Sequence, residues 1–128
     1  GWLVFSATAA PQQQEEQKSE RDQVKSEARQ AFMRGKLVSN QKIVEGLSLK
    51  NFEMIQEGAA AVVVLVKGQH WFVLDTPGYR QHSQEMTRAA QRLLDAAKDG
   101  NIEGAALRYF DLTLTCIDCH QYLETEGL

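Results

Sequence analysis

The chain has 128 residues, of which 43% are apolar and 24% are charged. This length accommodates one compact domain and is too short for two. A formal net charge of -3 gives no support for nucleic acid or an anionic membrane as a partner. The two cysteines lie within four residues of each other. This excludes a disulfide framework, because such a framework needs cysteines far apart in the chain.

Residues 1–10 differ from the rest of the chain. An apolar run over residues 2–5 is followed by small residues with an A-x-A pattern at residues 7–9. This pattern is typical of the end of a secretory signal peptide, so we expect an exported, periplasmic protein. The run is too short to span a bilayer, and no stable membrane insertion is expected. The alternative is an N-terminal arm, with the folded domain in residues 11–128 in either case.

Four segments have the residue types and the periodicity of helices. They cover residues 11 to about 46, about 50 to 67, about 80 to 98, and 102 to about 124. Gly46 is expected at the end of the first, and Ser48 and Asn101 are expected to cap the second and the fourth. The stretch AAAVVVLV in the second segment could also be a buried strand. We favour helix, because a lone strand would have no partner.

Short connections between four helices predict an all-α fold, an antiparallel up-down-up-down four-helix bundle. The longest connection, residues 68–79, contains glycine and proline breakers. In the last helix the expected buried residues are Ile102, Ala106, Phe110 and Thr113. In the first helix, apolar and small residues recur at helical spacing at Val24, Ala28, Ala31, Phe32, Leu37, Val38, Ile43 and Val44.

The strongest motif is Cys-Ile-Asp-Cys-His at residues 116–120, near the end of the last predicted helix. C-x-x-C-H is the signature of covalent haem c attachment. On a helix, Cys116, Cys119 and His120 share one face. Both thiols can therefore reach one edge of a porphyrin, and the imidazole can bind the iron from the same turn.

Two other interpretations of this motif are weaker. A thioredoxin-like C-x-x-C would open a helix after a strand, whereas this one lies near the end of a helix. A zinc site would need a fourth ligand, and the other histidines, His70 and His82, are remote in sequence. We interpret those two histidines as ordinary surface residues.

The position of this motif on the fourth helix of a small bundle resembles the class II cytochromes c, the family of cytochrome c′ and its low-spin relatives. A second similarity is the stretch ARQAFMRGKL at residues 28–37. The resemblance covers about residues 20–125. It implies a periplasmic haem protein, often a homodimer, in which a first-helix residue faces the other side of the haem.

Matching the R-Q-x-x-hydrophobic pattern of that family, counted from Arg29, puts Met33 at this distal position. A methionine there implies a six-coordinate, low-spin iron with His/Met ligation. The alternatives are that Met33 fills a gap in the core, or that Phe32 faces the haem and leaves the iron five-coordinate. Arg29 and Arg34, together with Lys36, could pair with the haem propionates, although each could also be a solvated surface residue. Met54 and Met86 are expected in the core, and Trp71, Phe72 and Tyr79 could close over a haem edge.

These observations predict a single-electron carrier that exchanges electrons with redox partner proteins and is not an enzyme. The alternative is a five-coordinate cytochrome c′ that binds NO or CO. One departure weakens this alternative: cytochrome c′ commonly has a basic residue four positions after the haem histidine, and this chain has Glu124 there. A small haem peroxidase is a third possibility, and the apolar residues around Met33 argue against it.

Overall fold

The protein is described by a computed structural model that covers residues 1, 3, 10–68 and 73–128. Its elements are α1 (Pro11–Ser48), α2 (Phe52–Lys67), α3 (Pro77–Lys98) and α4 (Ile102–Thr125). No strand occurs in the described part of the chain, and the AAAVVVLV stretch lies within α2. The prediction of an all-α fold is confirmed.

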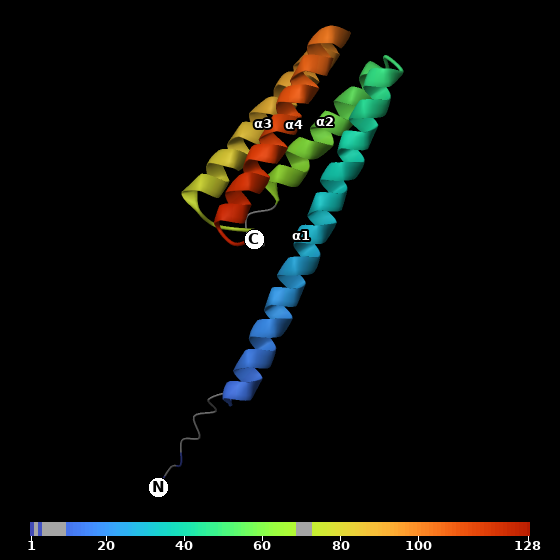
Figure 1. Cartoon of the computed structure of the whole chain (residues 1–128). Coiled ribbons are helices and arrows are strands. Elements are labelled where there is room, and N and C mark those ends of the chain that lie inside the picture. Colours follow the sequence, from blue (N-terminus) through green and yellow to red (C-terminus); the bar gives the residue numbers. More distant parts are fainter. Residues whose placement is uncertain (2, 4–9, 69–72) are drawn as a thin grey trace.

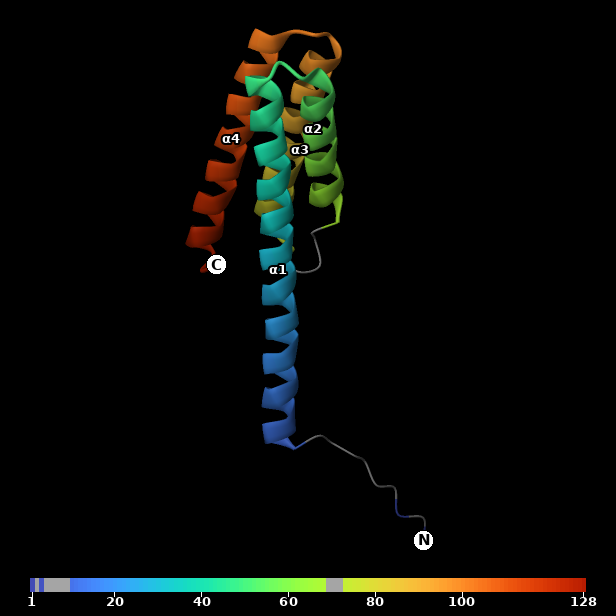
Figure 2. The same cartoon turned by 90° about the vertical axis from the view of Figure 1, so that its right-hand side faces the viewer.

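The helices form an up-down-up-down bundle in which neighbours in sequence run antiparallel (Figure 1). Extensive contacts join α1 to α2, α2 to α3, and α3 to α4, whereas α1 and α4 touch only slightly. Figure 2 shows α1 and α4 side by side. Of the four seams of the bundle, the one between the first and the last helix is therefore the loosest.

Two clusters of buried side chains make up the core. The larger one fills the centre of the bundle and consists of Ile43, Ile55, Ala59, Val62, Val66, Met86, Ala89, Ala90, Leu93, Ala97, Ala105 and Leu112. The smaller one lies near the end of α4 and consists of Phe32, Val73, Tyr79, Cys119 and Leu123. Met33 is partly buried and packs against this second cluster. The second cluster thus contains part of the predicted haem site.

The N-terminal part of α1 projects beyond the other three helices (Figures 1 and 2). Residues 11–25 are all exposed, and the first buried residue of α1 is Phe32. Residues 2 and 4–9 lie outside the described residues, so the export prediction that rests on them stays a prediction. Among the described residues, no helix has the length and apolar character needed to cross a membrane.

Two predicted helix boundaries are wrong, and both lie in the connection between α1 and α2. Gly46 is inside α1 and is buried. Helix α2 approaches it so closely that a Cβ at this position would lie 2.9 Å from the backbone nitrogen of Ile55. The helix continues to Ser48 and ends where Lys50 adopts a φ of 51°. Asn51, rather than Ser48, caps α2, and its side chain accepts a hydrogen bond from the Met54 amide at 3.2 Å.

The starts of α4 and α3 differ in how well the sequence predicts them. Asn101 caps α4 as expected, accepting a hydrogen bond from the Gly104 amide at 2.9 Å. The third helix begins at Pro77, three residues earlier than predicted. Thr76 caps it, and proline fits the first turn of a helix because the amide hydrogen that it lacks has no partner there. A Thr-Pro pair is the sequence signal for this helix start.

The predicted inward face of the last helix is partly wrong. Phe110 is 62% exposed and Ala106 is exposed, whereas Ile102 and Thr113 are half-buried. The buried residues are Ala105, Leu112, Cys119 and Leu123. The reason is that α4 packs closely on α3 and little on α1, so its inward face is rotated away from α1.

The first helix also exposes apolar residues that recur at helical spacing. Leu37 is 58% exposed, and Val24, Val38 and Val44 are likewise largely exposed. Helix α1 is buried mainly through the stripe that contains Phe32, Lys36, Ser39 and Ile43.

Close packing of α1 on α2 at Gly58 gives a stability prediction. A Cβ at Gly58 would lie 2.6 Å from Cγ1 of Ile43 and 2.8 Å from the carbonyl oxygen of Ser39. We expect Gly58→Ala to destabilise the fold by about 1–3 kcal/mol through overpacking, against a helix-propensity gain of about 1 kcal/mol. Gly35→Ala is the control, because its Cβ would meet only the flexible tip of Leu65 at 3.3 Å. Urea unfolding of both variants measures the difference, and equal stability would contradict the close packing.

Candidate functional site

The three motif residues Cys116, Cys119 and His120 lie on the continuous helix α4 and line one cavity of about 230 Å³. Their spacing places them on neighbouring positions of the same side of the helix. Cys119 is 5% exposed, Cys116 is half-buried and His120 is exposed. The structure therefore brings both thiols and the imidazole to one hollow, as the motif requires.

The other walls of the cavity come from α1 and α3. Helix α1 contributes Met33, Lys36, Leu37 and Asn40, and α3 contributes Tyr79 and Met86. Met33 thus faces the same cavity as Cys116 and His120, although more than 80 residues separate them in sequence. Met86 is also 3% exposed and part of the core, as expected, whereas Met54 is half-buried and lies outside this lining.

Phe32 is not among the residues that line the cavity. It is 6% exposed and packs in the cluster that contains Cys119. The ammonium of Lys36 lies 4.1 Å from the centre of its ring, which is a cation–π distance. Of the two candidate distal residues, Met33 is the one that borders the cavity.

The cavity is open to solvent along the loose seam between α1 and α4. Leu37, which is 58% exposed, and the exposed His120 both form part of its lining. Its volume is below the roughly 300–1,000 Å³ that is usual for small-molecule sites. A ligand of haem size would therefore also occupy the seam, and α1 and α4 make few contacts that would have to be broken.

A larger hollow of about 640 Å³ lies at the other end of α3 and α4. Its lining includes the charged residues Arg92, Asp95 and Asp111. Its described lining residues include neither cysteine nor histidine.

Both thiols in the cavity are free, and burial raises the pKa of each. The nearby Lys36 ammonium acts in the opposite direction on both, because a positive charge favours the thiolate. Burial has the larger effect, so the thiols carry their protons at neutral pH. The pKa of the buried Tyr79, which also borders the cavity, is raised by burial too.

Lys36 is the residue of the cavity lining whose burial the sequence interpretation does not anticipate. It is 8% exposed, and burial lowers its pKa to about 8. In the described part of the chain its ammonium forms no ion pair and no hydrogen bond, and its polar contact is the face of the Phe32 ring. The sequence signal for this burial is the position of Lys36, which lies at helical spacing between Phe32 and Ser39 on the buried side of α1.

The remaining predicted residues that the structure describes are not part of the cavity lining. Arg29 is half-buried and Arg34 is exposed, so a role toward propionates stays a prediction for both. His82 stacks on Tyr122 with ring centres 5.0 Å apart, and its Nδ1 is buried with no hydrogen-bond partner. Glu124 is exposed. His70, Trp71 and Phe72 lie outside the described residues.

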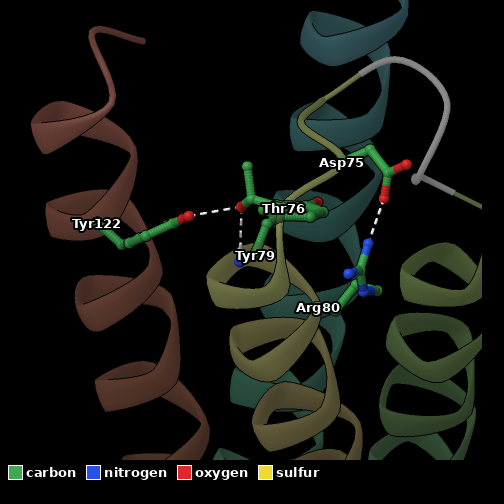
Figure 3. Close-up of polar contacts among 5 residues, drawn as sticks. All are labelled: Asp75, Thr76, Tyr79, Arg80 and Tyr122. Carbon is green, nitrogen blue, oxygen red and sulfur yellow. Dashed lines mark hydrogen bonds and ion pairs between the residues drawn. The ribbon is translucent and has the colours of Figure 1, made fainter.

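A hydrogen bond connects the start of α3 to the end of α4, close to the motif. The hydroxyl groups of Thr76 and Tyr122 lie 2.5 Å apart, and the same Thr76 oxygen accepts from the Tyr79 amide (Figure 3). Arg80 pairs with Asp75 on the other side of this corner. Since Tyr122 follows His120 by two residues, the Thr76 cap holds the last turns of α4 in place.

Among the described residues, no group of three or more His, Cys, Asp and Glu side chains is arranged to hold a metal ion. Comparison with protein-family models, with curated proteins and with solved structures gives no significant match. The resemblance to class II cytochromes c therefore rests on the sequence motifs.

Removal of the Tyr122 hydroxyl gives a second stability prediction. Tyr122→Phe should destabilise the fold by about 1 kcal/mol, because it removes one partly buried hydrogen bond between α3 and α4. Thermal unfolding monitored by circular dichroism measures the change. Tyr109→Phe is a comparison on the same helix, at a residue that is also half-buried. An unchanged melting temperature for Tyr122→Phe would show that this bond does not hold α4.

The buried Lys36 predicts an unusual pH dependence for protein expressed without haem. Its pKa is about 8 in the fold and about 10.5 when unfolded, so between these values the unfolded state binds more protons. Stability contributed by this group therefore rises with pH in that window. Lys36→Met should be more stable than the wild type at pH 7, by on the order of 2 kcal/mol, and this advantage should shrink between pH 8 and 10.5.

Urea unfolding of both proteins over that pH range tests this prediction. The difference between them reports on Lys36 most directly up to about pH 9, because both thiols are protonated there; above it the thiols ionise, and their pKa values themselves depend on Lys36. A constant difference from pH 7 to 10.5 would contradict the depressed pKa.

Proposed function

We propose that this chain is an exported, periplasmic monohaem c-type cytochrome of the class II type, which carries single electrons. The observation that supports this best is the shared cavity. It combines two thiols and an imidazole from α4 with a methionine thioether from α1. These are the two attachment groups and the two axial ligands of a six-coordinate haem c.

Cys116 and Cys119 would hold the haem through thioether bonds. Each thiol adds across one vinyl double bond, with the sulfur bonding to one carbon and the thiol hydrogen going to the other, so no atom is lost. His120, one residue further along, would bind the iron from the α4 side. The bound haem supplies the one-electron couple between ferric and ferrous iron.

Met33 would bind the iron from the side of α1. A thioether is a neutral, polarisable ligand, and His/Met ligation raises the reduction potential of a haem. Leu37, Tyr79 and Met86 contribute the apolar lining around these groups. They would limit access of water, and a drier haem has a different potential from a solvated one.

Redox partner proteins are part of this proposal, and a homodimer is compatible with the apolar residues exposed on α1 and α4. The alternative function is a five-coordinate haem that binds NO or CO. It would require Met33 to fill a gap without binding iron. Met33 lines the same cavity as the motif residues, and this favours its ligation to the iron.

An optical spectrum of the purified haem-loaded protein tests the proposal. We expect low-spin ferric and ferrous spectra, no change of the ferrous spectrum on adding CO, and the weak red thioether-to-iron band in the ferric form. Met33→Ala should abolish that band and allow CO to bind, because it removes the sixth ligand. Met54→Ala is the matched control, since Met54 is a half-buried methionine outside the cavity lining.

Met86→Leu belongs in the same experiment because Met86 also borders the cavity. The band should persist in this variant. Loss of the band in Met86→Leu but not in Met33→Ala would assign ligation to α3 instead. A high-spin wild-type spectrum that shifts with CO would favour the gas-binding alternative, and absence of covalent haem would refute the proposal as a whole.

A further inference from the structure

Among the described residues that line the cavity, Lys36 is the one lysine or arginine, and none is an aspartate or glutamate. Lys36 borders the same space as both thiols and His120, and it is 8% exposed. Among the described residues, the ion pairs of the fold involve Lys42, Arg80, His82 and Arg108, and none involves Lys36. The fold thus holds a buried ammonium with no carboxylate beside it.

Burial of an ammonium without an anion is costly, since the charge loses its hydration and gains only a weak compensation from a ring face. The lowered pKa of Lys36 reflects this cost, because burial disfavours its charged form. An anion brought into the cavity would reverse the effect through a charge-assisted hydrogen bond. The ligand expected from this site is therefore one that carries an anionic group, such as a carboxylate.

We propose that Lys36 forms an ion pair with a propionate carboxylate of the bound haem, from inside the cavity. This inference rests on the proposed function, and it assigns to Lys36 a role that Arg29 and Arg34 would otherwise share. Those two arginines lie outside the cavity lining, and Arg34 is exposed. An exposed pair with a propionate would be screened by water, whereas a pair at Lys36 would be largely shielded from it.

Lys36 is a positioning residue in this proposal and is distinct from the axial ligands. Met33 and Lys36 lie three residues apart on α1, so they occupy neighbouring positions on one side of the helix. The two side chains would then hold two different parts of the same ligand, the iron and one carboxylate. Two such contacts from one helix would hold the haem more firmly than the iron ligand alone.

The positive charge of Lys36 should also favour the ferrous form, because reduction removes one positive charge from the iron. In the haem-loaded protein we expect Lys36→Met and Lys36→Gln to retain covalent haem. Both should shift the ferric/ferrous equilibrium about fivefold toward ferric, a fall of about 40 mV in midpoint potential at 59 mV per tenfold change. The haem propionate bending band in the resonance Raman spectrum should shift in both variants.

Lys36→Arg should restore most of the potential and the Raman band, because it retains the charge. Lys42→Met is the matched control: it removes one lysine from the same helix, and that lysine pairs with Glu57 on the surface. We expect it to change the equilibrium less than twofold. Loss of haem from both neutral variants with retention in Lys36→Arg would also support the proposal.

Three results separate failure of this inference from failure of the proposed function. Potentials and Raman bands that stay at wild-type values in Lys36→Met and Lys36→Gln would overturn the inference and leave the cytochrome proposal intact. A low-spin spectrum that depends on Lys36 but not on Met33 would make Lys36 an iron ligand, which also overturns it. A wild-type protein without covalent haem would refute the proposed function itself.

Discussion

The close contact of α1 with α2 determines which side of α1 faces the cavity. At Gly58 the helices approach so closely that a Cβ would meet both Ile43 and the backbone of Ser39. Lys42 and Glu57 form an ion pair across the same seam. With this side of α1 held against α2, the positions that turn toward α4 are those of Met33, Lys36, Leu37 and Asn40.

The second helix pair is held in a similar way. Helix α4 packs closely on α3, and the Thr76–Tyr122 hydrogen bond joins the two helices just beyond the motif. The bundle therefore consists of two tight helical hairpins, α1–α2 and α3–α4, joined mainly through α2 and α3. The thiols and the imidazole belong to one hairpin, and Met33 and Lys36 belong to the other. The candidate site lies where these two hairpins meet loosely.

Helical periodicity is enough to predict the number, type and approximate extent of the helices, since these depend on local patterns of apolar residues. Local caps are predictable where their chemistry is simple, as at Asn101. The first connection is not, because Gly46 packs closely against α2, and no local pattern reveals that contact. The spacing of Cys116, Cys119 and His120 predicts one shared side of the last helix, because positions three and four residues apart are neighbours on a helix surface.

Other features depend on which helix lies beside which, and local sequence patterns do not contain that information. Phe110 is predicted inside if an apolar stripe faces the bundle centre, yet the loose contact with α1 leaves it 62% exposed. For Lys36 the sequence leaves a propionate partner and a solvated surface position open, and its burial is unexpected because lysine is rarely buried. The pattern-based choice of Met33 as the residue opposite the motif matches its place in the cavity lining. Haem binding itself stays a prediction.

A loose seam has a chemical consequence for a site of this kind. The cavity is smaller than a macrocycle needs, so the two hairpins would have to move apart to admit one. Such a movement would separate α1 from α4, which touch only slightly, and leave the α1–α2 and α3–α4 contacts in place. Before binding, Lys36 is a buried charge without a counter-ion and Leu37 is an exposed apolar side chain. Both are unfavourable in the free protein, and both would be relieved by a ligand with an apolar ring and a carboxylate. A bound haem would therefore remove both unfavourable features, because its ring would cover Leu37 and a propionate would pair with Lys36.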